Sequence, residues 1–179
     1  MLQSRKSEIR IAGLGGQGVV LAGHILGKAA VKDGLQVVQT QSYGAEARGS
    51  AAKSEVILSN LKIGFPMVRK SDVLVAMNQT ALDKHLTDLK EDGILILDPS
   101  MIKEVPSVNA RVFKVEATKT AEAEFKSRMY ANIIMLGAIA KITKLVTQDS
   151  LEKAIRETFS GEAAQKNIVA FKLGYDLVK

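Results

Sequence analysis

Cysteine is absent from this 179-residue chain, and histidine occurs only at His24 and His85. Without cysteine, the chain can form no disulfide, offer no thiol nucleophile and ligate no cysteine-bound iron–sulfur cluster. Two histidines far apart in the sequence also argue against a histidine-rich metal site within one chain. We therefore expect no metal site and no catalytic residue here, and we place any electron transfer or metal chemistry on a partner chain.

Aromatic residues are scarce as well, with no Trp, three Tyr and five Phe. The formal net charge is nevertheless +6, and it is uneven, because residues 1–90 carry 12 Lys and Arg against 7 Asp and Glu. Nucleic-acid surfaces interleave aromatic side chains with cations, a pattern that these scattered basic residues do not form. We predict an anionic ligand or partner near the first half of the chain, and no nucleic acid.

Long hydrophobic runs are also missing. The longest apolar run spans residues 129–140, and its 12 residues are too few to cross a bilayer. The segment 1–8 lacks the apolar core of a signal peptide, so we expect a cytoplasmic protein without membrane contact. Because a helix that is apolar on most faces is buried, we expect residues 129–140 to lie in the core or against another subunit.

Hydrophobic residues make up 46% of the chain, which is enough to build one sizeable core, and we expect a single domain over residues 1–179. The hydrophobic periodicity predicts strands at 8–12, 35–40, 52–58, 72–77, 94–97 and 111–115, and helices at 19–31, 78–90, 119–128, 130–145, 149–159 and 162–177. This order indicates an α/β fold, a three-layer sandwich with a mainly parallel sheet and a C-terminal helical portion. We expect the first two strands to pair in parallel and Gly93 to end the second helix.

A glycine-rich turn, Gly13-Leu-Gly15-Gly-Gln-Gly18, connects the first predicted strand to the first helix. Such a Rossmann-like turn brings backbone N–H groups and a helix N-terminus together, and these favour an anion such as phosphate. Dinucleotide sites also need an acidic residue after the second strand, and residues 37–41 contain none. The turn therefore predicts either an anion other than NAD or merely close packing of the strand against the helix.

The turn is followed by Thr40-Gln-Ser-Tyr-Gly-Ala-Glu-Ala-Arg-Gly49. Together the two segments resemble the γ subunits of 2-oxoacid:ferredoxin oxidoreductases, in which Gly-x-Gly-Gly-Gln-Gly is paired with Tyr-Gly-x-Glu-x-Arg-Gly-Gly. The segments 72–76, 93–98 and 132–137 are similar to that family too, so the resemblance covers nearly the whole chain. The Thr-Gln-Ser-Tyr-Gly form resembles the 2-oxoglutarate branch, and Ser50 stands where the family has its second glycine.

The resemblance implies one subunit of a larger enzyme. Such enzymes oxidatively decarboxylate a 2-oxoacid to an acyl-CoA and pass electrons to ferredoxin. Thiamine diphosphate and Mg²⁺ are held by α and β subunits, and [4Fe-4S] clusters by β or a ferredoxin-like δ subunit. The γ chain is then inactive alone, binds no cofactor tightly, shapes the assembly and helps to bind CoA; a homodimer is an alternative for the isolated chain.

The candidate contacts to CoA or another anion are Gly13, Gly15, Gly16, Gln17, Gly18, Tyr43 and Arg48. For three of them a structural role is open: Gln17 can brace the turn, Arg48 can pair with Glu46 or a partner, and Tyr43 can pack at a subunit interface. His85 is expected at the surface, and His24 has no neighbour in sequence that would orient it as a base.

Two other functions stay open from the sequence. One is a stand-alone nucleotide-dependent oxidoreductase, which predicts tight binding of NAD(H) or NADP(H) by the chain itself. The other is a purely structural assembly subunit whose glycine turn binds nothing.

Overall fold

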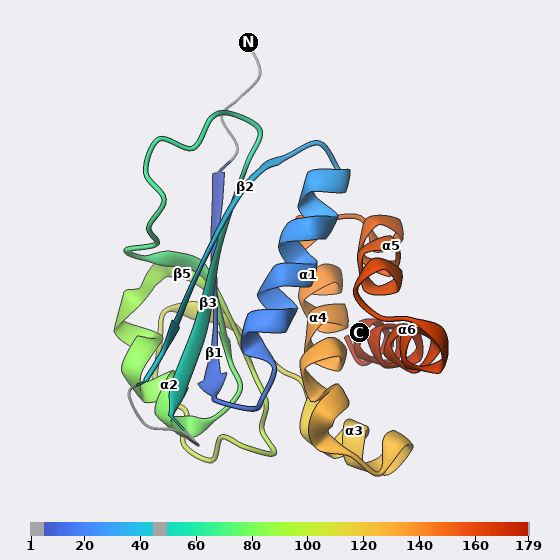
Figure 1. The fold of residues 1–179 in the computed structure, drawn as a ribbon. Coiled ribbons are helices and arrows are strands. Elements are labelled where there is room, and N and C mark those ends of the chain that lie inside the picture. The colour runs from blue at the N-terminus through green and yellow to red at the C-terminus, as the bar shows by residue number, and fades with distance from the viewer. Residues whose placement is uncertain (1–5, 45–49, 179) are drawn as a thin grey trace.

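A mixed sheet of six strands lies between layers of helices in the computed structural model, which describes residues 6–44 and 50–178 (Figure 1). The strands are β1 Lys6–Leu14, β2 Gln36–Tyr43, β3 Ala51–Ser59, β4 Ser71–Ala76, β5 Leu89–Leu97 and β6 Ala110–Lys114. Their order across the sheet is β2-β3-β1-β4-β5-β6. Parallel pairing joins β1, β4, β5 and β6, so the mainly parallel α/β sheet is confirmed.

The expected direct pairing of the first two strands is wrong. β3 lies between β1 and β2 and is antiparallel to both. Burial explains this order, because Val56, Ile57 and Leu58 of β3 are almost inaccessible to solvent, whereas every residue of β2 is at least partly exposed. The apolar strand takes the central position, and the glutamine-rich strand takes the edge, where polar side chains are tolerated.

One face of the sheet is covered by α1 Val19–Lys32 and α4 Ala131–Thr143, on which α5 Gln148–Thr158 and α6 Gly161–Asp176 form an outer layer (Figure 1). The other face carries α2 Gln79–His85. Strand β4 is buried on both sides, since Val73 and Val75 join the core under α1 and α4, and Leu74 joins the core under α2. Together with α3 Ala117–Phe125, these elements confirm the predicted C-terminal helical portion.

Helix α4 is buried along residues 131–140, as the apolar run predicts. Met129 departs from that prediction, because 82% of its surface is exposed. It lies in the 3₁₀ turn Arg128–Tyr130 that precedes α4, outside the packed helix. In the part of the chain that the structure describes, no helix combines the length and the hydrophobicity needed to cross a membrane.

The second predicted helix is shorter than expected. α2 ends at His85, a 3₁₀ turn spans Leu86–Asp88, and β5 begins at Leu89. Gly93 therefore lies inside β5 and does not end a helix. The pairing of β5 with β4 shifts register between Ser71 and Val73, and Asp92 has a φ of 58°. This irregularity lets the chain enter the sheet five residues earlier than the apolar run predicts.

His85 is buried, with 7% of its surface exposed, so its expected surface position is wrong. The buried residues of α2 are Ala81, Leu82 and His85, and this spacing puts the imidazole on the helix face that meets the sheet. Burial lowers the pKa of His85 from 6.5 to about 4, and the charges of Arg10, Lys53 and Lys84 add to the effect.

Candidate functional site

The glycine turn lies at the carboxyl edge of the parallel strands, between β1 and α1. Gly16 and Gly18 have φ angles of 95° and 71°, and Gly18 is the N-cap of α1. A Cβ atom at Gly18 would lie 2.3 Å from Nδ2 of Asn132, whose amide donates to the Gly18 carbonyl at 3.1 Å. Only glycine therefore fits at Gly18, on both backbone and steric grounds.

Gln17 braces the turn from within. Its Oε1 accepts a hydrogen bond from the Leu14 N–H at 2.7 Å, and its Nε2 donates to the Met77 carbonyl at 3.0 Å. The side chain thus joins the end of β1 to the residue that follows β4. The bracing role of Gln17 is confirmed by these bonds, and a contact with CoA stays a prediction.

Some of the turn amides already have partners. The Gly15 N–H donates to the Ser50 carbonyl at 2.7 Å, and the Gln17 N–H donates to the Leu14 carbonyl at 3.1 Å. Ser50 is buried and is not among the residues with positive φ, so a serine is accommodated where the resembling family has glycine.

Other amides at the head of α1 are available to a ligand. Within the described part of the chain, the N–H groups of Gly16 and Gly18 have no protein acceptor, and Gly18 provides no side-chain cap. The first N–H groups of a helix have no partner inside it, and the helix dipole adds about half a positive charge there. This end of α1 can therefore bind an anion.

A cavity of about 460 Å³ lies on the β2 side of the turn. It is lined by Leu14, Gly15, Gly16, Gly18, Val19, Val20, Leu21, His24, Gln39, Gln41, Tyr43 and Ala52. We call it the β2 pocket. Tyr43 lies at this pocket with 61% of its surface exposed, and the described residues of the lining include no Asp or Glu. The ionisable side chains of this described lining are His24 and Tyr43.

A second cavity, of about 380 Å³, lies on the β4 side of the turn. It is lined by Leu14, Gly15, Gly16, Gln17, Met77, Met101, Thr118, Arg128, Met129 and Ala131. We call it the switch-point pocket. The connection from β1 crosses one face of the sheet and the connection from β4 crosses the other, so the sheet changes winding direction between these strands. Ligands of open α/β sheets bind at such a point.

A buried carboxylate shapes the switch-point pocket. Asp98 is completely inaccessible, and its two oxygens accept from the N–H of Ser100 at 2.9 Å and of Thr118 at 2.7 Å. These bonds hold the start of α3 against the end of β5. Arg128 supplies the cation of the lining and is paired with Glu122 of α3.

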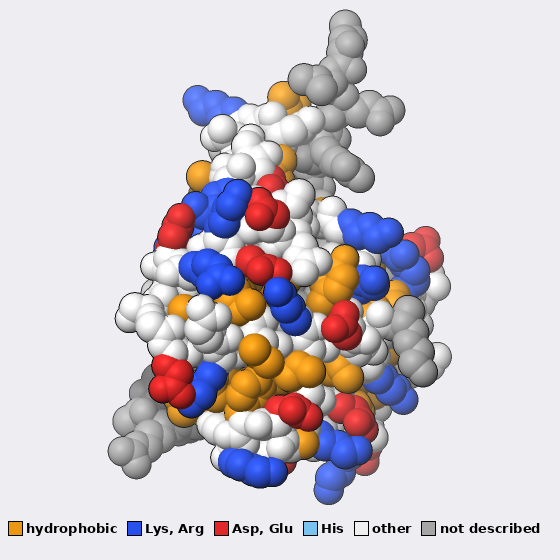
Figure 2. Space-filling model, turned by 90° about the vertical axis from the view of Figure 1, so that its right-hand side faces the viewer, with side chains coloured by type: hydrophobic (Ala, Val, Ile, Leu, Met, Phe, Trp, Pro, Cys, Tyr) orange, Lys and Arg blue, Asp and Glu red, His pale blue; other side chains and the backbone are white. Residues whose placement is uncertain are grey.

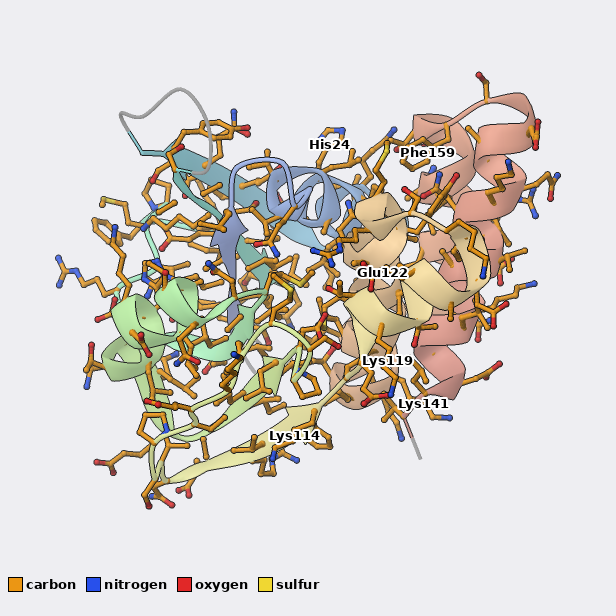
Figure 3. All side chains as sticks on the ribbon, turned by 90° about the horizontal axis from the view of Figure 1, so that it is seen from below. His24, Lys114, Lys119, Glu122, Lys141 and Phe159 are labelled. Atoms are coloured by element: carbon orange, nitrogen blue, oxygen red, sulfur yellow. The ribbon has the colours of Figure 1, made fainter. Side chains whose placement is uncertain are left out.

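The two pockets lie on different sides of the turn. Figure 3 looks onto this edge from below and shows His24 on α1, at the β2 pocket, well apart from Glu122 on α3, beside the switch-point pocket. The described lining of neither pocket brings an acid and a base together. Among residues 6–44 and 50–178, no group of His, Asp or Glu could hold a metal ion. Within this described part, the edge offers free backbone amides and a helix N-terminus, and neither pocket lining offers an acid–base pair.

The structure brings together most of the predicted site. Gly15, Gly16 and Gly18 line the β2 pocket beside Tyr43, and Gly13 lies behind the turn, where its hydrogen leaves room for Gln17. Arg48 lies outside the described residues. The sequence reasoning missed Met77, Met101, Thr118, Arg128 and Asn132. Their shared signal is position, because most of them follow a strand or precede a helix at the same sheet edge.

Comparisons with known proteins show which family and which fold this chain is similar to. The family model described as pyruvate ferredoxin/flavodoxin oxidoreductase matches residues 8–177. The 2-oxoglutarate synthase subunit KorC of Methanocaldococcus jannaschii is 45% identical over 177 residues, which cover 97% of this chain and 95% of that protein.

Two solved structures share the fold. The γ subunit of a keto/oxoacid ferredoxin oxidoreductase from Geobacter sulfurreducens has a TM-score of 0.85 and 39% identity, over 96% of this chain and 97% of that one. The 2-oxoglutarate:ferredoxin oxidoreductase of Magnetococcus marinus, with 2-oxoglutarate, coenzyme A and succinyl-CoA bound, has a TM-score of 0.89 and 25% identity. It aligns with 97% of this chain, and 31% of that longer chain is covered.

Proposed function

Because this chain belongs to the pyruvate ferredoxin/flavodoxin oxidoreductase family, we propose that it is the γ subunit of a multi-subunit 2-oxoacid:ferredoxin oxidoreductase whose substrate is 2-oxoglutarate. Support for the subunit role comes from the full-length similarity to a solved γ subunit. Support for the substrate comes from the 45% identity to a 2-oxoglutarate synthase subunit. The reaction yields succinyl-CoA and CO₂ and passes two electrons to ferredoxin.

The cofactors of this reaction belong to other subunits. The sequence has no cysteine for a [4Fe-4S] cluster, and the described residues provide no carboxylate or histidine group for Mg²⁺. Thiamine diphosphate, bound by the α and β subunits, supplies the decarboxylation and acyl-transfer chemistry. The γ chain therefore works only in the assembly, with α, β and a ferredoxin-like subunit as its partners.

The contribution of this chain is to hold CoA. The observation that carries this proposal is the glycine turn. Among the described residues, the amides of Gly16 and Gly18 have no protein acceptor at the uncapped N-terminus of α1, and the adjoining pocket lining has no acidic side chain. The phosphates of CoA are the anions of this reaction that suit such a site. By fixing the phosphates, the turn would orient the mobile thiol arm toward the partner active site.

A nicotinamide dinucleotide suits this edge less well. In the dinucleotide fold the second strand neighbours the first, and its acidic residue holds the ribose. Here β3 separates β2 from β1, which moves the end of β2 about 5 Å farther from the turn. The side chains of β2 at the pocket are Gln39, Gln41 and Tyr43, and none is a carboxylate.

A charge substitution in the turn tests CoA binding. A Cβ atom at Gly16 would meet no atom within 4 Å, so Gly16→Asp and Gly16→Asn fit equally, and Asx side chains tolerate positive φ better than most. The two variants differ only in one negative charge. We expect the CoA affinity of the assembled enzyme to fall at least tenfold further in Gly16→Asp than in Gly16→Asn. Equal affinities would contradict the phosphate site.

Ligand-dependent thermal stability separates this function from its alternatives. CoA at a hundred times its Kd should raise the unfolding free energy of the assembled enzyme by about 2.7 kcal/mol, and NAD should have no effect. Stabilisation and turnover with a nicotinamide coenzyme by the purified chain alone would favour a stand-alone oxidoreductase. Assembly with thiamine-binding and cluster-binding chains, without any CoA effect of this chain, would favour a purely structural subunit.

A further inference from the structure

The connection between β3 and β4 exposes a cluster of large apolar side chains. Leu61, Phe65 and Met67 have 46%, 45% and 59% of their surfaces exposed. We call residues 60–70, which contain them, the apolar loop. Figure 1 shows this loop at the end of the sheet opposite the glycine turn. Clustered exposed apolar residues mark surfaces that contact other macromolecules.

The loop is fixed to the sheet at its two ends. The Val68 carbonyl accepts a hydrogen bond from Nη2 of Arg10 at 3.0 Å, and both Val68 and Arg10 are buried. At the other end, the Leu61 N–H donates to Oγ of Ser59 at 3.0 Å. The guanidinium of Arg69, directly after Val68, lies 5.0 Å from the centre of the Phe65 ring. The apolar side chains therefore point out from an anchored base and do not fill this chain's own core.

The charges of the loop all have one sign. Lys62, Arg69 and Lys70 are exposed, and residues 60–70 contain no Asp or Glu. The helical face differs: Figure 2 shows hydrophobic side chains there with both Lys or Arg and Asp or Glu around them. On α6, for example, exposed Val169 lies near the Lys166–Glu162 ion pair. The side chains of the loop itself thus carry only positive charge, which favours a partner surface of opposite charge.

We propose that the apolar loop docks onto another subunit of the same oxidoreductase, at an apolar patch bordered by Asp and Glu. This inference rests on the proposed function, which makes the chain part of an assembly. A second copy of this chain suits the loop poorly, because a two-fold contact would place the same three cations against one another. Docking at the amino edge of the sheet leaves the glycine turn at the carboxyl edge open to CoA.

The test uses the assembled enzyme, purified through an affinity tag on a thiamine-binding subunit. Two variants probe the loop: Phe65→Ser with Met67→Ser removes apolar contacts, and Lys62→Glu with Lys70→Glu reverses charges. Matched controls are Val31→Ser, which is 60% exposed on α1, and Lys103→Glu, an exposed lysine outside the loop. We expect both loop variants to bind the complex at least tenfold more weakly than the wild type and both controls to bind normally.

The variant Lys62→Glu with Lys70→Glu distinguishes weaker docking from misfolding, because surface substitutions of this kind leave the folded state intact. Loop variants that co-purify as well as the controls overturn the inference. The inference is also overturned if the loop variants assemble normally with the other subunits but lose self-association, which would make a second copy the occupant, or lose binding to anionic vesicles, which would make a lipid surface the occupant. If the wild-type chain does not co-purify with the thiamine-binding subunit, the proposed function fails. If the wild type and the loop variants co-purify equally well, only the docking inference fails.

Discussion

The two edges of the sheet use charge in different ways. At the carboxyl edge, the glycine turn offers backbone amides and a helix N-terminus, and the described linings of the two adjoining pockets contain no acidic side chain. At the amino edge, side-chain charges neutralise one another: Lys90 contacts Glu8 at 2.9 Å and Asp72 at 2.8 Å. The paired charges at the ends of β1, β4 and β5 hold these strands together, and the unpaired amides of the glycine turn are the groups that suit an anionic ligand.

The pKa shifts of Glu8 and Lys90 show that both groups are stabilised in their charged forms by their ion pairs. Burial alone would raise the pKa of Glu8, but hydrogen bonds from Lys6 and Lys90 outweigh it, and the pKa is lowered. Burial would likewise lower the pKa of Lys90, yet its bonds to Asp72 and Glu8 raise it. Both groups stay charged at neutral pH, so the network holds the strand ends together and retains little charge for a ligand.

The largest expected effect concerns the buried guanidinium between the sheet and the apolar loop. Arg10 is 3% exposed and contacts Glu55 at 2.7 Å and Asp88 at 2.8 Å. Arg10→Met should lower the free energy of unfolding by about 3–5 kcal/mol, because the buried carboxylate of Glu55 loses its buried partner and keeps only the partly exposed Lys53, at 2.9 Å. Urea unfolding measures this. Arg111→Met, at an exposed position of β6, is the control, and equal losses in both variants would contradict the role of Arg10.

The next effect separates backbone strain from steric crowding in two glycines. Gly18 at the turn and Gly34 after α1 have φ angles of 71° and 82°. A Cβ atom would lie 2.3 Å from Asn132 at Gly18 and would meet nothing within 4 Å at Gly34. Gly34→Ala should therefore cost about 1 kcal/mol of strain, and Gly18→Ala about 3 kcal/mol, because overpacking is added. Comparable losses in thermal unfolding would show that Asn132 does not restrict the turn.

A pH-dependent effect of about 2 kcal/mol is expected from His85. Its folded pKa of about 4 lies below the ordinary 6.5, so the unfolded chain binds the proton first as the pH falls. The contribution of His85 to stability is thus complete above pH 6.5 and is lost between pH 6.5 and 4. From pH 7 to 5 the unfolding free energy should fall by about 2 kcal/mol. In His85→Gln this part of the pH dependence should disappear; an unchanged slope would place the imidazole in water.

The smallest effect tests the brace at the carboxyl edge. Gln17→Met removes the acceptor of the Leu14 N–H and the donor to the Met77 carbonyl. Because the site is only partly buried, we expect a loss of about 1–2 kcal/mol. Gln148→Met, at an exposed position of α5, should lie within about 0.5 kcal/mol of the wild type. Chemical denaturation of both variants checks the difference, and a neutral Gln17→Met would show that water replaces the brace.

The features that could be predicted from the sequence are those that depend on residues close together in the chain. The glycine turn lies within six residues, and its pattern acts locally, so its place between a strand and a helix was predictable. The insertion of β3 between β1 and β2 depends on pairing over longer separations, to which no local pattern responds. The switch-point pocket was missed for the same reason, since Met77, Met101 and Arg128 meet only because of the strand order.

His85 illustrates a nearer limit. Lys84 and Thr87 beside it are polar and indicate a surface position, whereas the helical spacing to Ala81 and Leu82 puts it on the buried face. Met129 shows the opposite case, in which an apolar residue at the head of an apolar run is exposed because the helix begins two residues later. In both cases, the side chain's position depends on where the helix begins or which face it buries.

Hydrogen exchange in the assembled enzyme tests most directly whether the glycine turn binds CoA. Exchange would be followed at the amides of residues 15–21 with and without saturating CoA. We predict slower exchange at Gly16 and Gly18, little change at Gly15, whose N–H already donates to Ser50, and none at Gly34. Unchanged exchange at Gly16 and Gly18 would contradict the assignment of this edge to CoA.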